Sequence, residues 1–115
     1  MEESILTTIK KMLGITEEYK HFDTDIVIHI NSALMVLHQL GVGLDKPGRI
    51  ASEMDTWVSV LGETEDIEAI KTYVYIKVKL IFDPPTNSSV LNAYKEELKE
   101  LEWRLNVQVD NGEEE

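Results

Sequence analysis

The chain has 115 residues and carries 22 acidic against 11 basic side chains, which gives a formal net charge of −11 at pH 7. Its length is that of one compact domain, and a hydrophobic fraction of 43% supports a packed core. Because the chain has no cysteine, disulfides, thiolate metal sites and thiol nucleophiles are excluded. No apolar run approaches the roughly 20 residues that span a bilayer, and the acidic N-terminus is unlike a signal peptide, so we expect no membrane contact.

The acidity also argues against tight or sequence-specific DNA binding. Such binding gains its strength from lysines and arginines that replace the counterions of the phosphate backbone. Here the basic residues are few, and each near-cluster of lysines has carboxylates close to it in sequence. The negative charge is compatible with three roles: keeping the protein soluble, binding a basic partner, or preventing adhesion to nucleic acid.

Apolar residues at helical spacing predict a first helix over residues 5–13, with Gly14 as its C-terminal cap. After a polar loop, a second helix is predicted over about residues 25–40, capped by Asp23 or Thr24. Most apolar residues of this second helix share one wide face, which should pack on the core.

The middle of the chain is less regular. Residues 41–49 form a loop rich in glycine, and residues 50–61 fit one or two helical turns better than a strand, because no partner strand is predicted nearby. A third long helix is predicted over residues 65–82, stopped by two prolines at 84 and 85. It is apolar on most sides, so it either lies centrally in the core or is covered by a neighbouring chain.

A fourth helix is predicted over residues 89–105, with an apolar stripe and a charged outer side. The predicted fold is therefore all-α: a small single-domain bundle of about four main helices plus a short helical segment, with an extended C-terminal tail. We place the helical domain at residues 1–106 and a flexible acidic tail at residues 107–115, which show no helical periodicity.

No constellation of residues predicts chemistry. His29 and His38 are nine residues apart on one predicted helix and point to opposite sides, so they cannot share a metal through it. Residues 43–50 imitate the phosphate-binding pattern G-x-x-x-x-G-K-[ST], but Arg49 and Ile50 stand where its lysine and hydroxyl belong. We predict no catalytic, cofactor-binding or metal-binding residue, and no enzyme.

The sequence also carries more apolar residues than the core of one helical bundle needs. Trp103 lies roughly opposite the stripe of the last helix and is followed by Arg104, and both residue types are enriched at interaction hot spots. Trp103 could instead fold back on its own domain, and the sequence leaves that alternative open. Ile28 and Met35, on the outer side of the second helix, point toward other subunits.

Three stretches of the chain resemble the small head–tail connector (adaptor) proteins of long-tailed bacteriophages and related prophages. The first comprises residues 5–15 with 22–43, and the second comprises TW at 56–57 with VLG at 60–62. The third comprises residues 73–88 with EWRLNV at 102–107. The combination of FDPP with EWRLNV about twenty residues later is more specific than either piece alone.

The resemblance implies a virion structural protein at the head–tail interface, made in the host cytoplasm and without enzymatic activity or cofactor. It implies a homo-oligomeric ring, typically of twelve copies, that docks beneath the portal protein and receives the tail or a stopper (tail completion) protein. The ring would extend the channel for double-stranded DNA without sequence-specific binding.

The portal-contacting segment of the family is usually the C-terminal end of the last helix and its extension. In this chain that segment comprises Trp103, Arg104, Leu105, Asn106, Val107 and Val109. We assign the contact between subunits to Ile28, Met35, Tyr73 and Tyr75, which include the off-face residues of the second helix and two tyrosines of the third.

The charge leaves a second function open, that of an acidic helical protein-binding inhibitor or DNA mimic in a basic protein groove. Mimicry needs carboxylates in a phosphate-like array. Here they are dispersed along helices with lysines between them, which favours the connector.

Overall fold

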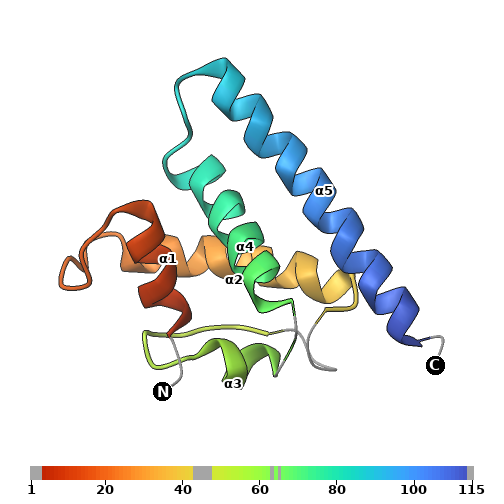
Figure 1. Ribbon diagram of the computed structural model, residues 1–115. Helices are drawn as coiled ribbons and strands as arrows, with labels where there is room; N and C mark the ends of the chain where they lie inside the picture. The colour runs from red at the N-terminus through yellow and green to blue at the C-terminus, as the bar shows by residue number, and fades with distance from the viewer. Residues whose placement is uncertain (1–3, 43–47, 63, 65, 114–115) are drawn as a thin grey trace.

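The structure is a computed structural model that describes residues 4–42, 48–62, 64 and 66–113, with side chains described as far as Val107. Its helices are α1 (Ile5–Leu13), α2 (Asp23–Gln39), α3 (Trp57–Leu61), α4 (Ile67–Phe82) and α5 (Ser88–Glu113) (Figure 1). Within the described ranges the only extended pairing is an isolated antiparallel bridge between Ser4 and Thr56. The all-α prediction, with four main helices and one short one, is confirmed.

The first helix begins and ends as predicted. The Ser4 hydroxyl accepts a hydrogen bond from the Thr7 amide at 3.2 Å, and Gly14 closes the helix with a φ of 83°, which suits glycine. For α2 the predicted cap is wrong. Phe22 holds the cap position without a side-chain hydrogen bond, and Asp23 lies within the first helical turn.

The centre of the core is α4, which contacts α1, α2 and α5 (Figure 1). Ile70, Tyr73 and Val78 are completely buried, and they lie on different sides of this helix. The apolar character of α4 on most sides therefore follows from its central place within one chain, the first of the two predicted explanations. The long axis of the molecule measures 45 Å and its shortest axis 21 Å.

The last helix runs further than predicted. It continues to Glu113 rather than ending near Leu105, because neither glycine nor proline interrupts residues 88–111 and its valines lower helix propensity only slightly. Leu101 and Leu105 are buried against the core, and the Asn106 amide donates to the Leu40 carbonyl at 3.4 Å. The mobility of residues 107–115 stays a prediction.

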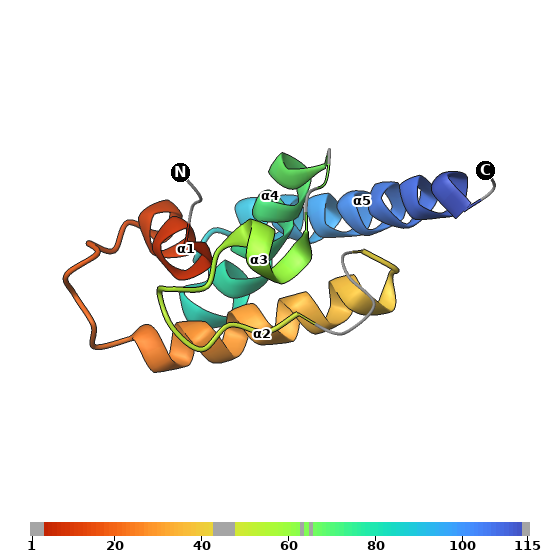
Figure 2. The ribbon, with the colours of Figure 1, turned by 90° about the horizontal axis from the view of Figure 1, so that it is seen from below.

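Residues 48–56 form a non-helical strap that passes along α2 and includes a turn at Glu53 and Met54 before α3 begins (Figure 2). The Asn31 side chain binds both backbone groups of Ile50, accepting from its amide at 2.7 Å and donating to its carbonyl at 3.0 Å. At Gly48 a Cβ would lie 2.5 Å from the Val60 Cγ1, so a larger residue would force the strap off α3. The one or two helical turns predicted within residues 50–61 form as α3, at the end of this range.

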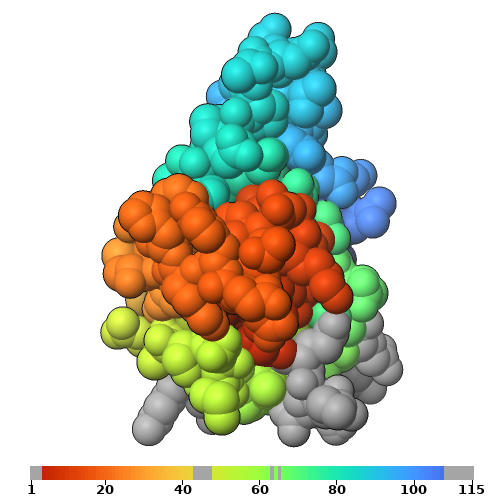
Figure 3. All heavy atoms as spheres, turned by 90° about the vertical axis from the view of Figure 1, so that its left-hand side faces the viewer, coloured from red at the N-terminus to blue at the C-terminus, as the bar shows by residue number. Residues whose placement is uncertain are grey.

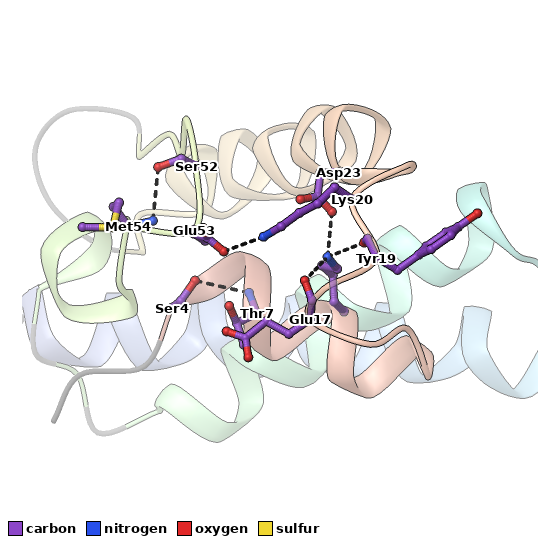
Figure 4. Close-up of polar contacts among 10 residues, drawn as sticks. Ser4, Thr7, Glu17, Tyr19, Lys20, Asp23, Ser52, Glu53 and Met54 are labelled. Atoms are coloured by element: carbon purple, nitrogen blue, oxygen red, sulfur yellow. Dashed lines mark hydrogen bonds and ion pairs between the residues drawn. The ribbon is translucent and has the colours of Figure 1, made fainter.

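A buried lysine holds the loop between α1 and α2. Lys10 is 2% exposed, and its Nζ lies 2.8 Å from the Asp23 Oδ1. The same ammonium donates to the Glu17 carbonyl at 3.1 Å and to the Tyr19 carbonyl at 2.7 Å. Figure 4 shows these three partners converging on one point at the end of α1. Two hydrogen bonds and the adjacent carboxylate therefore compensate the burial of this charge.

A second buried polar contact joins α4 to α5. The Tyr73 hydroxyl, inside the core, donates to the Glu102 Oε2 at 2.7 Å. Burial and this neighbouring carboxylate raise the pKa of Tyr73 above its ordinary value. On the same helix, burial and hydrogen bonding with Tyr94 raise the pKa of Tyr75 to about 12.

These shifts predict a loss of stability in alkali. A phenol whose pKa is higher in the folded than in the unfolded chain stabilises the fold at pH values below its unfolded pKa of about 10. This stabilisation is lost as the pH rises toward the folded pKa. Between pH 9 and pH 11, we expect the free energy of unfolding to fall further in the wild-type chain than in Tyr73→Phe. The difference between the two falls should be about 1.4 kcal/mol. Urea unfolding at both pH values measures this, and parallel falls in the two proteins would contradict it.

Candidate functional site

Large apolar side chains remain exposed on several helices. In the part of the chain that the structure describes they are Met12, Tyr19, Ile28, Met35, Met54, Val58, Ile81, Val90 and Trp103. Single exposed apolar residues are common on protein surfaces, so those that line a shared depression carry more weight. Two depressions include residues that the sequence singles out.

The first depression, the α2 face, has a volume of about 400 Å³ and is lined by Ile28, Asn31, Ser32, Met35, Gly48 and Arg49. Ile28 is 56% exposed and Met35 46%, because the core stripe of α2 lies on the opposite side of the helix. Arg49 is exposed at the rim, and it makes no hydrogen bond or ion pair with any described residue. The α2 face therefore combines apolar area with the positive charge of Arg49, with which no described carboxylate pairs.

The second depression, the α5 end, has a volume of about 340 Å³ and is lined by Asp66, Ala69, Trp103, Arg104, Leu105 and Val107. Trp103 is 67% exposed, so the alternative in which it folds back on its own core is wrong. Arg104 forms an exposed ion pair with Glu100 at 3.5 Å. The turn that carries these residues is fixed from beneath by the contact between Glu102 and Tyr73 and by Asn106.

Two predicted interface residues lie elsewhere than expected. Tyr73 was assigned to a contact between subunits, but it is completely buried and packs in its own core, so no neighbouring chain can reach it. Leu105 was assigned to the portal contact, but it is 3% exposed and anchors α5 against the core. Both corrections follow from the central position of α4, to which the inner side of α5 packs.

The other predicted residues keep accessible positions where their side chains are described. Ile28 and Met35 share the α2 face, and Asn106 is exposed beside the α5 end. Val107 lines the depression at the α5 end, and Tyr75 is half-buried between α4 and α5. The side chain of Val109 lies outside the described residues. The interface roles of these residues stay predictions.

Several side chains that fit apolar helical patterns in the sequence are exposed in the structure, among them Met54, Ile81 and Val90. Met54, at 81%, was counted in a predicted helical stripe, but it lies on the strap. Val90 belongs to the apolar stripe of the fourth predicted helix and Ile81 to the apolar residues of the third, but both side chains are exposed. For Val90 the available signal was the absence of charged residues from positions 84–94.

The polar residues form no constellation for catalysis or metal binding. Among the described residues, no group of three histidine, aspartate or glutamate side chains is placed to hold a metal ion. The carboxylates on the outer side of α5 alternate with cations: Glu96 lies 4.0 Å from Lys99, and Glu100 pairs with Arg104. This mixture of charges gives no support to the DNA-mimic alternative. No helix in the described ranges is long and apolar enough to cross a membrane.

The described residues form an all-α bundle with two partly apolar depressions on its surface. A family model described as "Phage connector protein" matches residues 5–112. The chain belongs to this phage connector family, whose role is structural, at the junction of the phage head and tail. No curated protein and no solved structure matches the chain.

Proposed function

We propose that the chain is the repeating subunit of a ring that docks beneath the portal, receives a tail-side protein and forms part of the DNA channel. The observation that carries this proposal is the family match over residues 5–112, which spans both the α2 face and the α5 end. The mechanism is assembly: each exposed surface of the subunit is buried by a particular neighbour.

The α5 end is the proposed portal contact. A hot-spot residue contributes most to the free energy of binding when its position is fixed beforehand, because less conformational entropy is then lost on binding. Trp103 satisfies this condition, since Leu101 and Leu105 anchor its helix in the core and Glu102 bonds to Tyr73.

The α2 face is the proposed lateral contact between subunits. Closed rings form from heterologous contacts, in which one face of each subunit meets a different face of the next. The apolar pair Ile28 and Met35 supplies area to bury, and Arg49 supplies a charge that an acidic neighbouring copy can compensate. With a net charge of −11 per subunit, the copies repel at long range, so assembly should strengthen as salt is raised from low ionic strength.

The same acidity suits a channel wall. A negative surface repels the phosphate backbone, so DNA passes without adhering. In the proposed ring, the inner wall is made by many copies of this acidic chain.

A test of the lateral contact uses Ile28→Glu and Met35→Glu, which place a carboxylate in the α2 face. We expect each to weaken assembly on portal rings by at least about tenfold, because a buried apolar contact is replaced by an unpaired charge beside acidic neighbours. Co-sedimentation with portal rings of the same phage, with bound copies per ring counted, measures the effect.

Met54→Glu is the matched control, because Met54 is more exposed and lies outside the α2 face. It should assemble like the wild-type chain. If Ile28→Glu and Met35→Glu load portal rings with unchanged copy number and affinity, the α2 face is not the lateral contact.

A further inference from the structure

The connection between α4 and α5 projects from the body of the molecule. Figure 3 shows residues of this connection standing beyond the surface formed by α1, the start of α2 and the strap. We name residues 81–94 the α4–α5 tip. Ile81 is 59% exposed and Val90 43% within it, so the projecting part of the molecule carries apolar surface.

The α4–α5 tip is also electrically neutral, in contrast to the rest of the chain. Residues 84–94 contain no charged side chain, although 29% of the whole chain is charged. The only charged residue of the tip, Asp83, is paired with Lys79, whose Nζ lies 3.1 Å from its Oδ2. An exposed stretch that lacks charge, in a protein with a net charge of −11, is a place where a partner can approach without like-charge repulsion.

The conformation of the tip is fixed within the chain. The Asn87 Oδ1 accepts from the Ser89 amide at 2.8 Å and from the Val90 amide at 3.3 Å, and so starts α5. At its base, the Phe82 ring packs edge-on against Phe22, with ring centroids 5.1 Å apart. Two consecutive prolines restrict the backbone between these points. The tip is therefore a preformed surface that loses little conformational entropy on binding.

The tip and the α5 end lie far apart on the same helix, and this sets the direction in which the tip projects. Val90 and Trp103 lie on the same helix, 13 residues apart in sequence, which is about 20 Å along the helix axis. The tip and the C-terminus stand at opposite ends of α5 (Figure 1). If the α5 end meets the portal, the tip faces away from it.

We propose that the α4–α5 tip is the docking surface for the protein on the tail side of the ring, which receives it in an uncharged apolar groove. This inference rests on the proposed function, because the portal contact sets the direction of α5. A second copy is the less suitable occupant. The lateral contact at the α2 face offers Arg49, whose charge an uncharged tip would leave unpaired.

The test uses DNA-filled heads that lack the connector and free tails, both from the phage that encodes this chain. Heads are loaded with wild-type chain, with an Ile81→Glu, Val90→Glu double variant, or with Met54→Glu as the exposed apolar control outside the tip. We expect all three to bind heads equally by co-sedimentation. Tail attachment, counted by electron microscopy, should fall at least about tenfold for the double variant alone.

Unchanged tail attachment to heads that carry the double variant would overturn the inference. So would loss of head binding by a folded double variant, because the tip would then belong to the head-side contact. A double variant of Ile81→Ser and Val90→Ser, which adds no charge, replaces the glutamates if thermal unfolding shows that they destabilise the fold. Failure of the wild-type chain to bind heads would instead contradict the proposed function itself, and this inference with it.

Discussion

Replacing Lys10 with methionine is expected to lower the free energy of unfolding by about 3 kcal/mol. The substitution keeps most of the side-chain volume but removes the ammonium that lies 2.8 Å from the Asp23 carboxylate. That carboxylate is only 22% exposed, so it would be left as a poorly hydrated charge. The carbonyls of Glu17 and Tyr19 lose their donor at the same time. Urea unfolding at neutral pH measures the change.

Lys11→Met is the matched control, because Lys11 is the next residue of the same helix and is exposed. It should change stability by no more than about 0.5 kcal/mol. Adding Asp23→Asn to Lys10→Met should recover part of the loss, since the unpaired charge is removed. A change below about 1 kcal/mol for Lys10→Met would show that the buried lysine does not hold the loop between α1 and α2.

Replacing Trp103 with alanine is expected to weaken binding to the portal ring about 30-fold, or about 2 kcal/mol. The indole is two-thirds exposed on a helix that is fixed from beneath, so its removal deletes contact area without opening a cavity in the core. Stability of the isolated chain should therefore change by less than about 0.5 kcal/mol. Co-sedimentation titrated with portal rings gives the affinity, and Met54→Ala, another exposed apolar truncation, should bind like the wild-type chain.

An affinity of Trp103→Ala within about twofold of the wild-type value would remove Trp103 from the portal contact. Truncation after Val107 separates this contact from the rest of α5, because it spares Leu105, which the core needs. A loss of binding on truncation together with full binding of Trp103→Ala would place the contact beyond Val107.

Helix positions could be predicted from the sequence because they depend on local patterns. The spacing of apolar residues in α1 and the glycine at position 14 indicate its two ends, and both agree with the structure. The two prolines after Asp83 mark the end of α4 in the same way. The exposure of Ile28 and Met35 also follows from the pattern, since a residue opposite the apolar stripe of a helix faces away from its core.

Two features that the sequence analysis did not predict, the burial of Lys10 and that of Tyr73, depend on contacts with segments outside their own helix. The place of Lys10 in the core depends on acceptors that the following loop brings to it, and a sequence pattern treats this lysine like its exposed neighbour Lys11. Tyr73 was assigned to the surface because α4 has more apolar residues than one stripe needs. Its burial requires α5 to cover the helix, a long-range contact that periodicity cannot reveal.

The most direct test of the central claim is electron microscopy of purified portal rings of the same phage, incubated with an excess of the wild-type chain. The account predicts an additional annular layer on one side of the portal, with one copy of the chain for each portal subunit. Trp103 should lie at the contact with the portal, and the α4–α5 tip should point away from it. Portal rings that carry no added density at saturating concentration, with the chain remaining free in solution, would contradict the account.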